Sequence, residues 1–174
     1  LRGCGYGYDK AIFGFGFPGS GVTGVTNLVS NVGVVATDTA AVGTARRDPS
    51  ATQYGGDKGI FGYGYITLSM TNLVSNVGVV GTDVTGVGTG RRTLAACSYG
   101  GDKGIFGYGE NAVTAITNLV SNVGVVATDV TGVGTARANL SATQYGDDKG
   151  IFGYGIGPVS MTNLVSNAGV VSTD

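Results

Sequence analysis

The sequence contains no histidine and no tryptophan, and it has only two cysteines, three prolines and a single glutamate. Without histidine, neither a Ser-His-Asp triad nor a Cys-His nucleophile can be built, and the usual histidine-bearing metal sites are excluded. Calcium loops of the Asp-x-Asp-x-Asp type are also absent. An enzyme would need a residue that breaks the repeat described below, and Glu110 is the sole candidate. We therefore expect a protein that is not an enzyme, with no metal and no cofactor.

Charge and long apolar runs are also scarce. Ten basic and eleven acidic residues leave a formal net charge of −1, with no cluster of either sign, so the chain has no basic patch for nucleic acid. Glycine and threonine interrupt every valine run, which argues against membrane insertion. The first residues, Leu1 to Gly5, include no starting methionine and no signal-peptide stretch, so we expect an excised piece of a longer chain.

What the sequence does have is glycine and a repeat. Glycine supplies 34 of 174 residues without a three-residue period, which excludes collagen, and 42% of the residues are hydrophobic. The dipeptide Asp-Lys recurs every 45 to 48 residues, and Thr-Asn-Leu-Val-Ser-Asn follows it each time. This pattern predicts one repeat domain, 1-174, built from four units. Their approximate bounds are 1-46, 47-91, 92-137 and 138-174.

Each unit divides at its turns into short runs rich in β-branched and aromatic residues, with no helical period. In the second unit the predicted strands cover 50–54, 59–65, 68–74 and 78–82. We therefore predict an all-β fold, a β-propeller of four tandem four-stranded antiparallel blades, because a repeat of this length suits a blade better than a solenoid coil.

The third unit shows a family resemblance. Arg91 precedes the small apolar run 94–96, a Gly-Gly-Asp-Lys turn occupies 100–103, and an aliphatic run with glycines covers 105–109. This order resembles a kelch repeat, which implies propeller blades, although the paired glycines are split by an aromatic residue and the usual tryptophan is missing. The amino-acid sequence of the repeats also resembles that of uncharacterised, highly repetitive proteins of marine phages and metagenomes. This resemblance implies a virion-associated or extracellular setting and no known activity.

The number of blades leaves two arrangements open. The chain can form a closed four-blade ring, or it can form half of a larger ring. In the second arrangement its partner is another copy, as in a homo-oligomer, or the rest of a longer propeller chain, because an open half-ring exposes two apolar blade faces.

The Asp-Lys dipeptide and a nearby tyrosine occur in every unit and give the candidate binding residues. They form a ring of polar sites with aromatic platforms, suited to a glycan or a surface protein. The alternative is that the dipeptides are polar turns and the tyrosines pack between blades. The candidates are Asp9, Lys10, Asp57, Lys58, Asp102, Lys103, Asp148, Lys149, Tyr6, Tyr54, Tyr99 and Tyr145.

Two further sets of residues are expected to be structural. Arg46, Arg91 and Arg137 lie in the connectors between units, where arginine holds loop carbonyls or a carboxylate. Cys4 and Cys97 occupy the same position in two units and are expected to be small buried hydrophobes, not a disulfide.

Taken together, these features predict a non-catalytic binding or adhesion module that recognises a glycan or host surface in a phage or bacterial context. The alternative is a purely structural virion or scaffold component.

Overall fold

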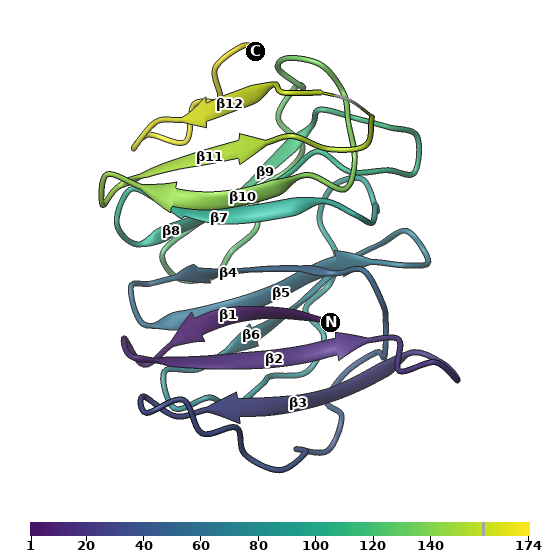
Figure 1. Ribbon diagram of the computed structural model, residues 1–174, viewed down its shortest axis with the longest axis vertical. Helices are drawn as coiled ribbons and strands as arrows, with labels where there is room; N and C mark the ends of the chain where they lie inside the picture. Colours follow the sequence, from purple (N-terminus) through teal and green to yellow (C-terminus); the bar gives the residue numbers. More distant parts are fainter. Residues whose placement is uncertain (158) are drawn as a thin grey trace.

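The computed structural model describes residues 1–157 and 159–174. Within these ranges every regular element is a β-strand, so the predicted all-β class is confirmed (Figure 1). The strands are β1 (Arg2–Tyr6), β2 (Lys10–Gly16), β3 (Thr23–Val29), β4 (Ser50–Tyr54), β5 (Lys58–Gly64), β6 (Leu68–Val74), β7 (Ala95–Tyr99), β8 (Lys103–Gly107), β9 (Thr117–Val120), β10 (Ser141–Tyr145), β11 (Lys149–Gly153) and β12 (Thr162–Val165).

These strands form four antiparallel sheets of three, one in each unit, and the middle strand of each sheet pairs with the other two. In the second unit, Ile60 pairs with Thr52 on one side and with Leu73 on the other. The turn between β4 and β5 contains Gly55 and Gly56, both with positive φ, a conformation that glycine adopts without a steric cost. The first three predicted strands of this unit therefore match the observed ones to within one residue.

The predicted fourth strand of each unit is not a regular strand. After β6, the chain returns beside it and makes isolated bridges, Val74 to Val80 and Thr71 to Val84. Between these bridges the side-chain amide of Asn72 donates to the carbonyl of Gly81 and to Asp83 at 3.1 and 2.9 Å. Backbone hydrogen bonds occur only at intervals, from Gly81 to Leu73 and between Val84 and Thr71, and Asn72 bridges the segment between them, so it has no continuous backbone ladder.

A β-bulge interrupts the register of β5 between Gly62 and Gly64. The residue between them, Tyr63, has a φ of 64° and a fully buried ring. The same conformation recurs at Phe15, Tyr108 and Tyr154, with φ of 55°, 62° and 61°. The aromatic residue that splits the paired glycines therefore directs its ring out of the regular strand alternation and, at Phe15, Tyr63 and Tyr108, into the contact with the next unit.

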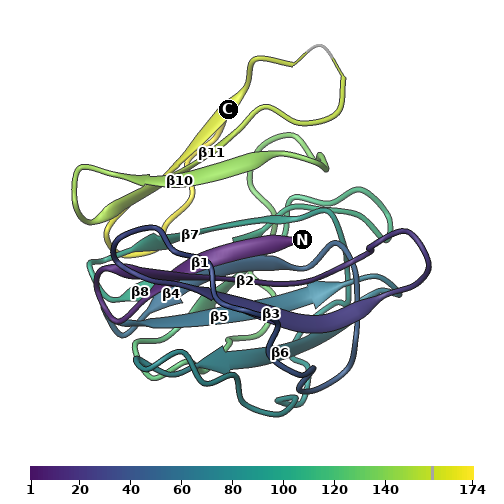
Figure 2. The same cartoon turned by 60° about the horizontal axis from the view of Figure 1, so that its bottom comes forward.

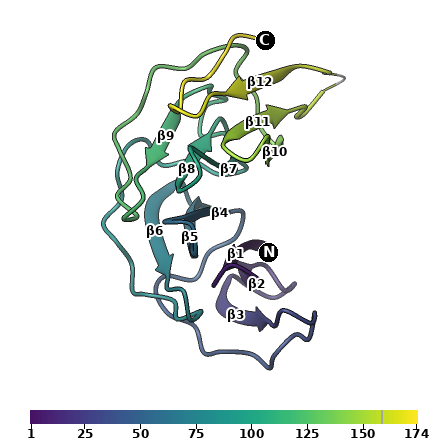
Figure 3. The same cartoon turned by 90° about the vertical axis from the view of Figure 1, so that its left-hand side faces the viewer.

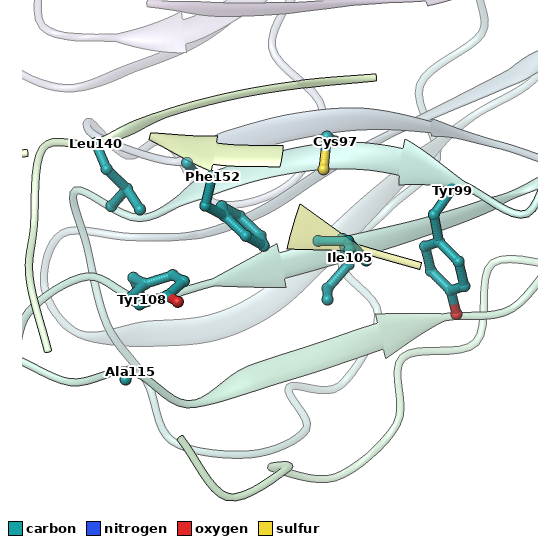
Figure 4. Packing of buried hydrophobic residues seen from close by; sticks show 9 residues of the cluster. Cys97, Tyr99, Ile105, Tyr108, Ala115, Leu140 and Phe152 are labelled. Atoms are coloured by element: carbon teal, nitrogen blue, oxygen red, sulfur yellow. The ribbon is translucent and has the colours of Figure 1, made fainter. Parts of the chain in front are cut away.

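The sheets follow one another along an open arc, with the first strands β1, β4, β7 and β10 in contact as neighbours (Figures 2 and 3). The core is divided into three clusters, each between two consecutive units. Figure 4 shows the third, where Phe152 of the last unit lies beside Tyr108 of the preceding one, with ring centroids 5.2 Å apart. The stability of the molecule therefore comes mainly from contacts between units.

Glycine allows these units to approach closely. A Cβ atom on Gly59 would lie 2.6 Å from Sγ of Cys4, and one on Gly150 would lie 2.6 Å from Sγ of Cys97. At the middle junction, Gly104 meets Thr52 in the same way, at 2.8 Å. The junctions therefore repeat one another in atomic detail, and a side chain at this glycine would force the units apart.

Candidate functional site

Each sheet has two ends, and they differ in chemistry. The turn edge, on the left in Figure 1, contains the turns after the first strand of each unit, residues 7–9, 55–57, 100–102 and 146–148. The loop edge, on the right, contains the loops after the second strand, within residues 17–22, 65–67, 108–116, 154–157 and 159–161, together with the connectors that carry Arg46, Arg91 and Arg137.

At the turn edge, each lysine of the Asp-Lys dipeptides donates to the aspartate before it, over 2.6 to 2.8 Å. This hydrogen bond, with a second from an asparagine such as Asn31, lowers the pKa of each aspartate below its usual value. The two charges of each dipeptide are therefore largely engaged with one another, and they leave little unpaired charge for a ligand.

The same dipeptides also join the units. The carbonyl of Asp57 accepts a 2.7 Å hydrogen bond from the backbone amide of Gly7 in the preceding unit, and Asp102 and Asp148 repeat this contact with Gly55 and Gly100. The polar-turn interpretation accounts for this arrangement. Ligand binding by the dipeptides stays a prediction.

Three of the four predicted tyrosine platforms are buried. Tyr6, Tyr54 and Tyr99 are 3%, 4% and 3% exposed, and their rings pack on glycines of the next unit. Burial raises the pKa of Tyr54 and of Tyr99. Packing between units therefore explains these rings, and only Tyr145, at 38% exposure, presents a ring to solvent.

The first arginine in each connector is a buried clamp, as the sequence predicts. Arg91 is fully buried, its Nε donates to the carbonyl of Tyr108 at 2.8 Å, and its Nη2 donates to Asn118 at 2.7 Å. Its guanidinium lies 4.4 Å from the centre of the Tyr63 ring. Arg46 and Arg137 make the equivalent carbonyl bond and ring contact.

Two of the connectors have a second arginine directly after the first, Arg47 or Arg92. These second arginines lie in a half-exposed cluster at the loop edge. Arg47 stacks on Tyr65, 4.1 Å from its ring centre, and lies 5.3 Å from the ring of Phe17. Arg92 lies 5.1 Å from the centre of the same Tyr65 ring and forms a 2.9 Å ion pair with Glu110. We call these five residues the arginine–aromatic cluster.

A cleft of about 400 Å³ opens beside this cluster. Its walls combine an aromatic ring, an ion pair, an amide, a hydroxyl and an exposed valine. They are formed by Tyr65, Thr67, Arg92, Glu110, Asn111, Ala112 and Val113. A second cleft, of about 370 Å³, follows the inner strands, but mostly alanine, serine and leucine line it. The loop-edge cleft therefore has the richer set of recognition groups.

The sequence predictions did not include this cluster, although the sequence contains a signal for it. Phe17, Tyr65 and Glu110 each follow the Gly-aromatic-Gly bulge at the same position of their units, so this position differs from copy to copy. The loops that begin there also differ in length. Variation within nearly identical repeats marks positions that the contacts repeated at every junction do not fix.

The cysteines have no reactive environment. Cys4 and Cys97 are unpaired, and burial raises the pKa of each thiol to about 12. Among the described residues, no group of three possible metal ligands comes together. The described part of the chain also includes no helix of the length and apolarity that a membrane span requires.

No protein-family model matches this chain, and no curated protein is significantly similar to it in sequence.

Proposed function

We propose that the chain is a non-catalytic binding module, an open segment of a kelch-like β-propeller that presents its loop edge to a glycan. One observation carries this proposal: the loop edge combines the greatest difference between units with half-exposed aromatic, guanidinium and carboxylate groups around one cleft. The turn edge and the junctions, in contrast, use nearly the same residues in every unit for contacts between units.

The propeller interpretation is supported by the face-to-face packing of the sheets along an arc and by the inner row of first strands. The bridged segment after the third strand takes the place of the fourth strand of a blade. In such an arrangement the loops of successive units lie side by side, so several weak contacts can add to one another through avidity.

The chemistry of the cleft favours an uncharged, hydroxyl-rich ligand. Tyr65 contributes an aromatic ring that Arg47 and Arg92 hold in place, while Asn111 and Thr67 offer donors and acceptors beside it. Arg92 and Glu110 neutralise one another at 2.9 Å, so the cleft has no free charge to attract a phosphate. Its volume of about 400 Å³ is within the usual range for small-ligand sites. A neutral glycan fits this combination best.

A glycan array tests the proposal, followed by titration of the strongest neutral glycan with single variants. We expect Tyr65→Ala to weaken binding about tenfold or more, because the aromatic wall of the cleft is lost. Tyr8→Ala is the matched control, since Tyr8 is 83% exposed in a turn-edge loop. Lys103→Ala tests the turn edge directly.

The outcomes separate the two edges. Loss of binding in Tyr65→Ala with normal binding in Tyr8→Ala and Lys103→Ala supports the proposal. The reverse pattern moves the site to the Asp-Lys dipeptides. An array without any competable signal overturns glycan binding and favours the second candidate, a structural virion or scaffold component.

The second candidate is favoured by the two uncovered ends of the arc. Tyr154 in the last unit is 63% exposed, whereas its counterparts Phe15, Tyr63 and Tyr108 are fully buried. Uncovered packing faces at both ends suit a component that assembles with other subunits. The virion or surface setting that the resemblance implies belongs to both candidates.

A further inference from the structure

The three junctions between units are built from the same contacts. Each unit has a tail side, the face toward the following unit, where a tyrosine such as Tyr54 packs on a hairpin glycine of that unit, Gly124. Each unit also has a head side, the face toward the preceding unit, where a phenylalanine such as Phe106 inserts against Gly62 and Tyr63 of that unit. A backbone hydrogen bond between the turns, Gly55 to Asp102, completes each junction.

The last unit has the tail side of this junction with nothing on it. Tyr145 is 38% exposed, whereas Tyr6, Tyr54 and Tyr99 are 3% to 4% exposed. A Cβ atom on Gly62 or Gly107 would lie 2.7 Å from a phenylalanine ring, but one on Gly153 would meet only Thr162 of its own sheet. The site that receives a phenylalanine is therefore empty here.

The first unit has the head side, also uncovered. Phe13 is 42% exposed, whereas its counterparts Phe61, Phe106 and Phe152 are fully buried. A side chain on the hairpin glycine Gly33 would meet no atom within 4 Å, whereas at the equivalent Gly78 it would meet Tyr6 at 3.0 Å. The group that inserts and the glycine that receives the tyrosine are both available.

We infer that the first unit of a second copy of this chain docks on the last unit of the first copy, head to tail, through a fourth example of this junction. Tyr145 packs on Gly33 of the other copy, Phe13 of that copy inserts against Gly153 and Tyr154, and the amide of Gly146 donates to the carbonyl of Asp9. The two faces differ, so the contact is heterologous and produces a closed ring or an extended row of copies.

Two features make this junction weaker than those within the chain. Where the other units have glycine at the close approach, the first unit has Ala11, and its methyl group would press on Thr143 just as a side chain on Gly104 would press on Thr52. In addition, the clamp arginine of each internal junction comes from the connector between its two units, and no connector joins two copies. We therefore expect association that depends on concentration.

Sedimentation velocity of the purified 174-residue chain over a wide concentration range tests the inference. We expect the mass to rise above the 17.3 kDa of one copy as the concentration increases. Tyr154→Ala and Phe13→Ala each weaken association at least tenfold, because each removes one side of the central aromatic contact. Ala11→Gly strengthens it about tenfold by relieving the overlap. Ile66→Ala, at a 71% exposed loop residue outside both faces, leaves it unchanged.

A particle of two copies indicates a closed ring and a ladder of masses indicates a row, and either supports the inference. It is overturned if the wild type and Ala11→Gly both remain at 17.3 kDa at every concentration. It is also overturned if association persists unchanged in both Tyr154→Ala and Phe13→Ala. Glycan binding plays no part in this test, so its result is independent of the proposed function.

Discussion

At the turn edge, nearly the same residues close the first hairpin of every unit, whereas at the loop edge the four loops differ in length and in chemistry. The contacts explain this contrast. A turn-edge residue such as Gly100 bonds to the next unit through its backbone, and its neighbour Tyr99 packs on that unit as well. Loop residues such as Ile66 and Val113 extend into solvent. Residues that hold two units together are constrained from both sides, and the others are free to acquire a function.

The same contrast appears between adjacent residues of one connector. Arg91 is fully buried beneath the next unit, while Arg92 is half-exposed and pairs with Glu110. Neighbouring side chains of an extended segment point to opposite sides, so one arginine can stabilise a junction while the next belongs to the surface. Substitutions that separate these two roles test the comparison most strongly.

The largest expected effect is that of Arg91→Ala. It leaves the carbonyl of Tyr108 and the side chain of Asn118 without their donor inside the molecule, so we expect a loss of about 3 kcal/mol or more in the free energy of unfolding. Arg92→Ala is the matched control and is expected to lose less than about 1 kcal/mol. Urea unfolding followed by circular dichroism measures both. Equal losses would show that the two arginines do not differ as proposed.

The next effect compares a covered tyrosine with an uncovered one. Tyr99→Ala removes a ring buried against the last unit and is expected to cost about 3 kcal/mol, whereas Tyr145→Ala at the open end costs less than about 1 kcal/mol. Both variants are compared in the same urea titration, at a protein concentration where the chain is monomeric. A loss in Tyr145→Ala as large as that in Tyr99→Ala would mean that the end face is already covered.

Much of this contrast can be predicted from the sequence, and the reasons for the remainder are physical. The repeat, the all-β class and three strands of the second unit follow from turn residues and β-branched runs, which are local signals. The fourth segment was predicted as a strand because 78–82 has strand-like composition, but the hydrogen bonds of Asn72 depend on tertiary placement. Arg92 and Tyr65 come together only when two units stack, so no single unit predicts the cluster.

A smaller effect is expected from acid. Burial alone would raise the pKa of Asp129, but hydrogen bonds from Thr89 and Asn118 outweigh it and lower the pKa below the ordinary value. The pKa of an aspartate in the unfolded chain is about 4. A carboxylate whose pKa is lower in the folded chain stabilises the fold above that pH, and this contribution is lost as the pH falls through the folded pKa. Stability measured by urea unfolding should therefore decline below about pH 4. Asp129→Asn should reduce the steepness of this decline, and an unchanged pH profile would contradict the assignment.

The smallest expected change in stability is that of Cys97→Thr, because the equivalent positions in two other units, Thr52 and Thr143, already have threonine. The cysteine itself reports on the junction. Burial raises the pKa of its thiol to about 12, so at pH 8 almost no thiolate is present in the closed junction, and a disulfide reagent can react only when the last two units separate. We expect the Cys97 thiol to react far more slowly in the folded chain than in urea. Tyr99→Ala should accelerate that reaction while Arg92→Ala should not, because only the first residue lies within the junction that covers the sulfur. Fast labelling of Cys97 in the folded wild-type chain would show that this junction opens in solution. It would then contradict the view that contacts between units constrain the turn edge more than the loop edge.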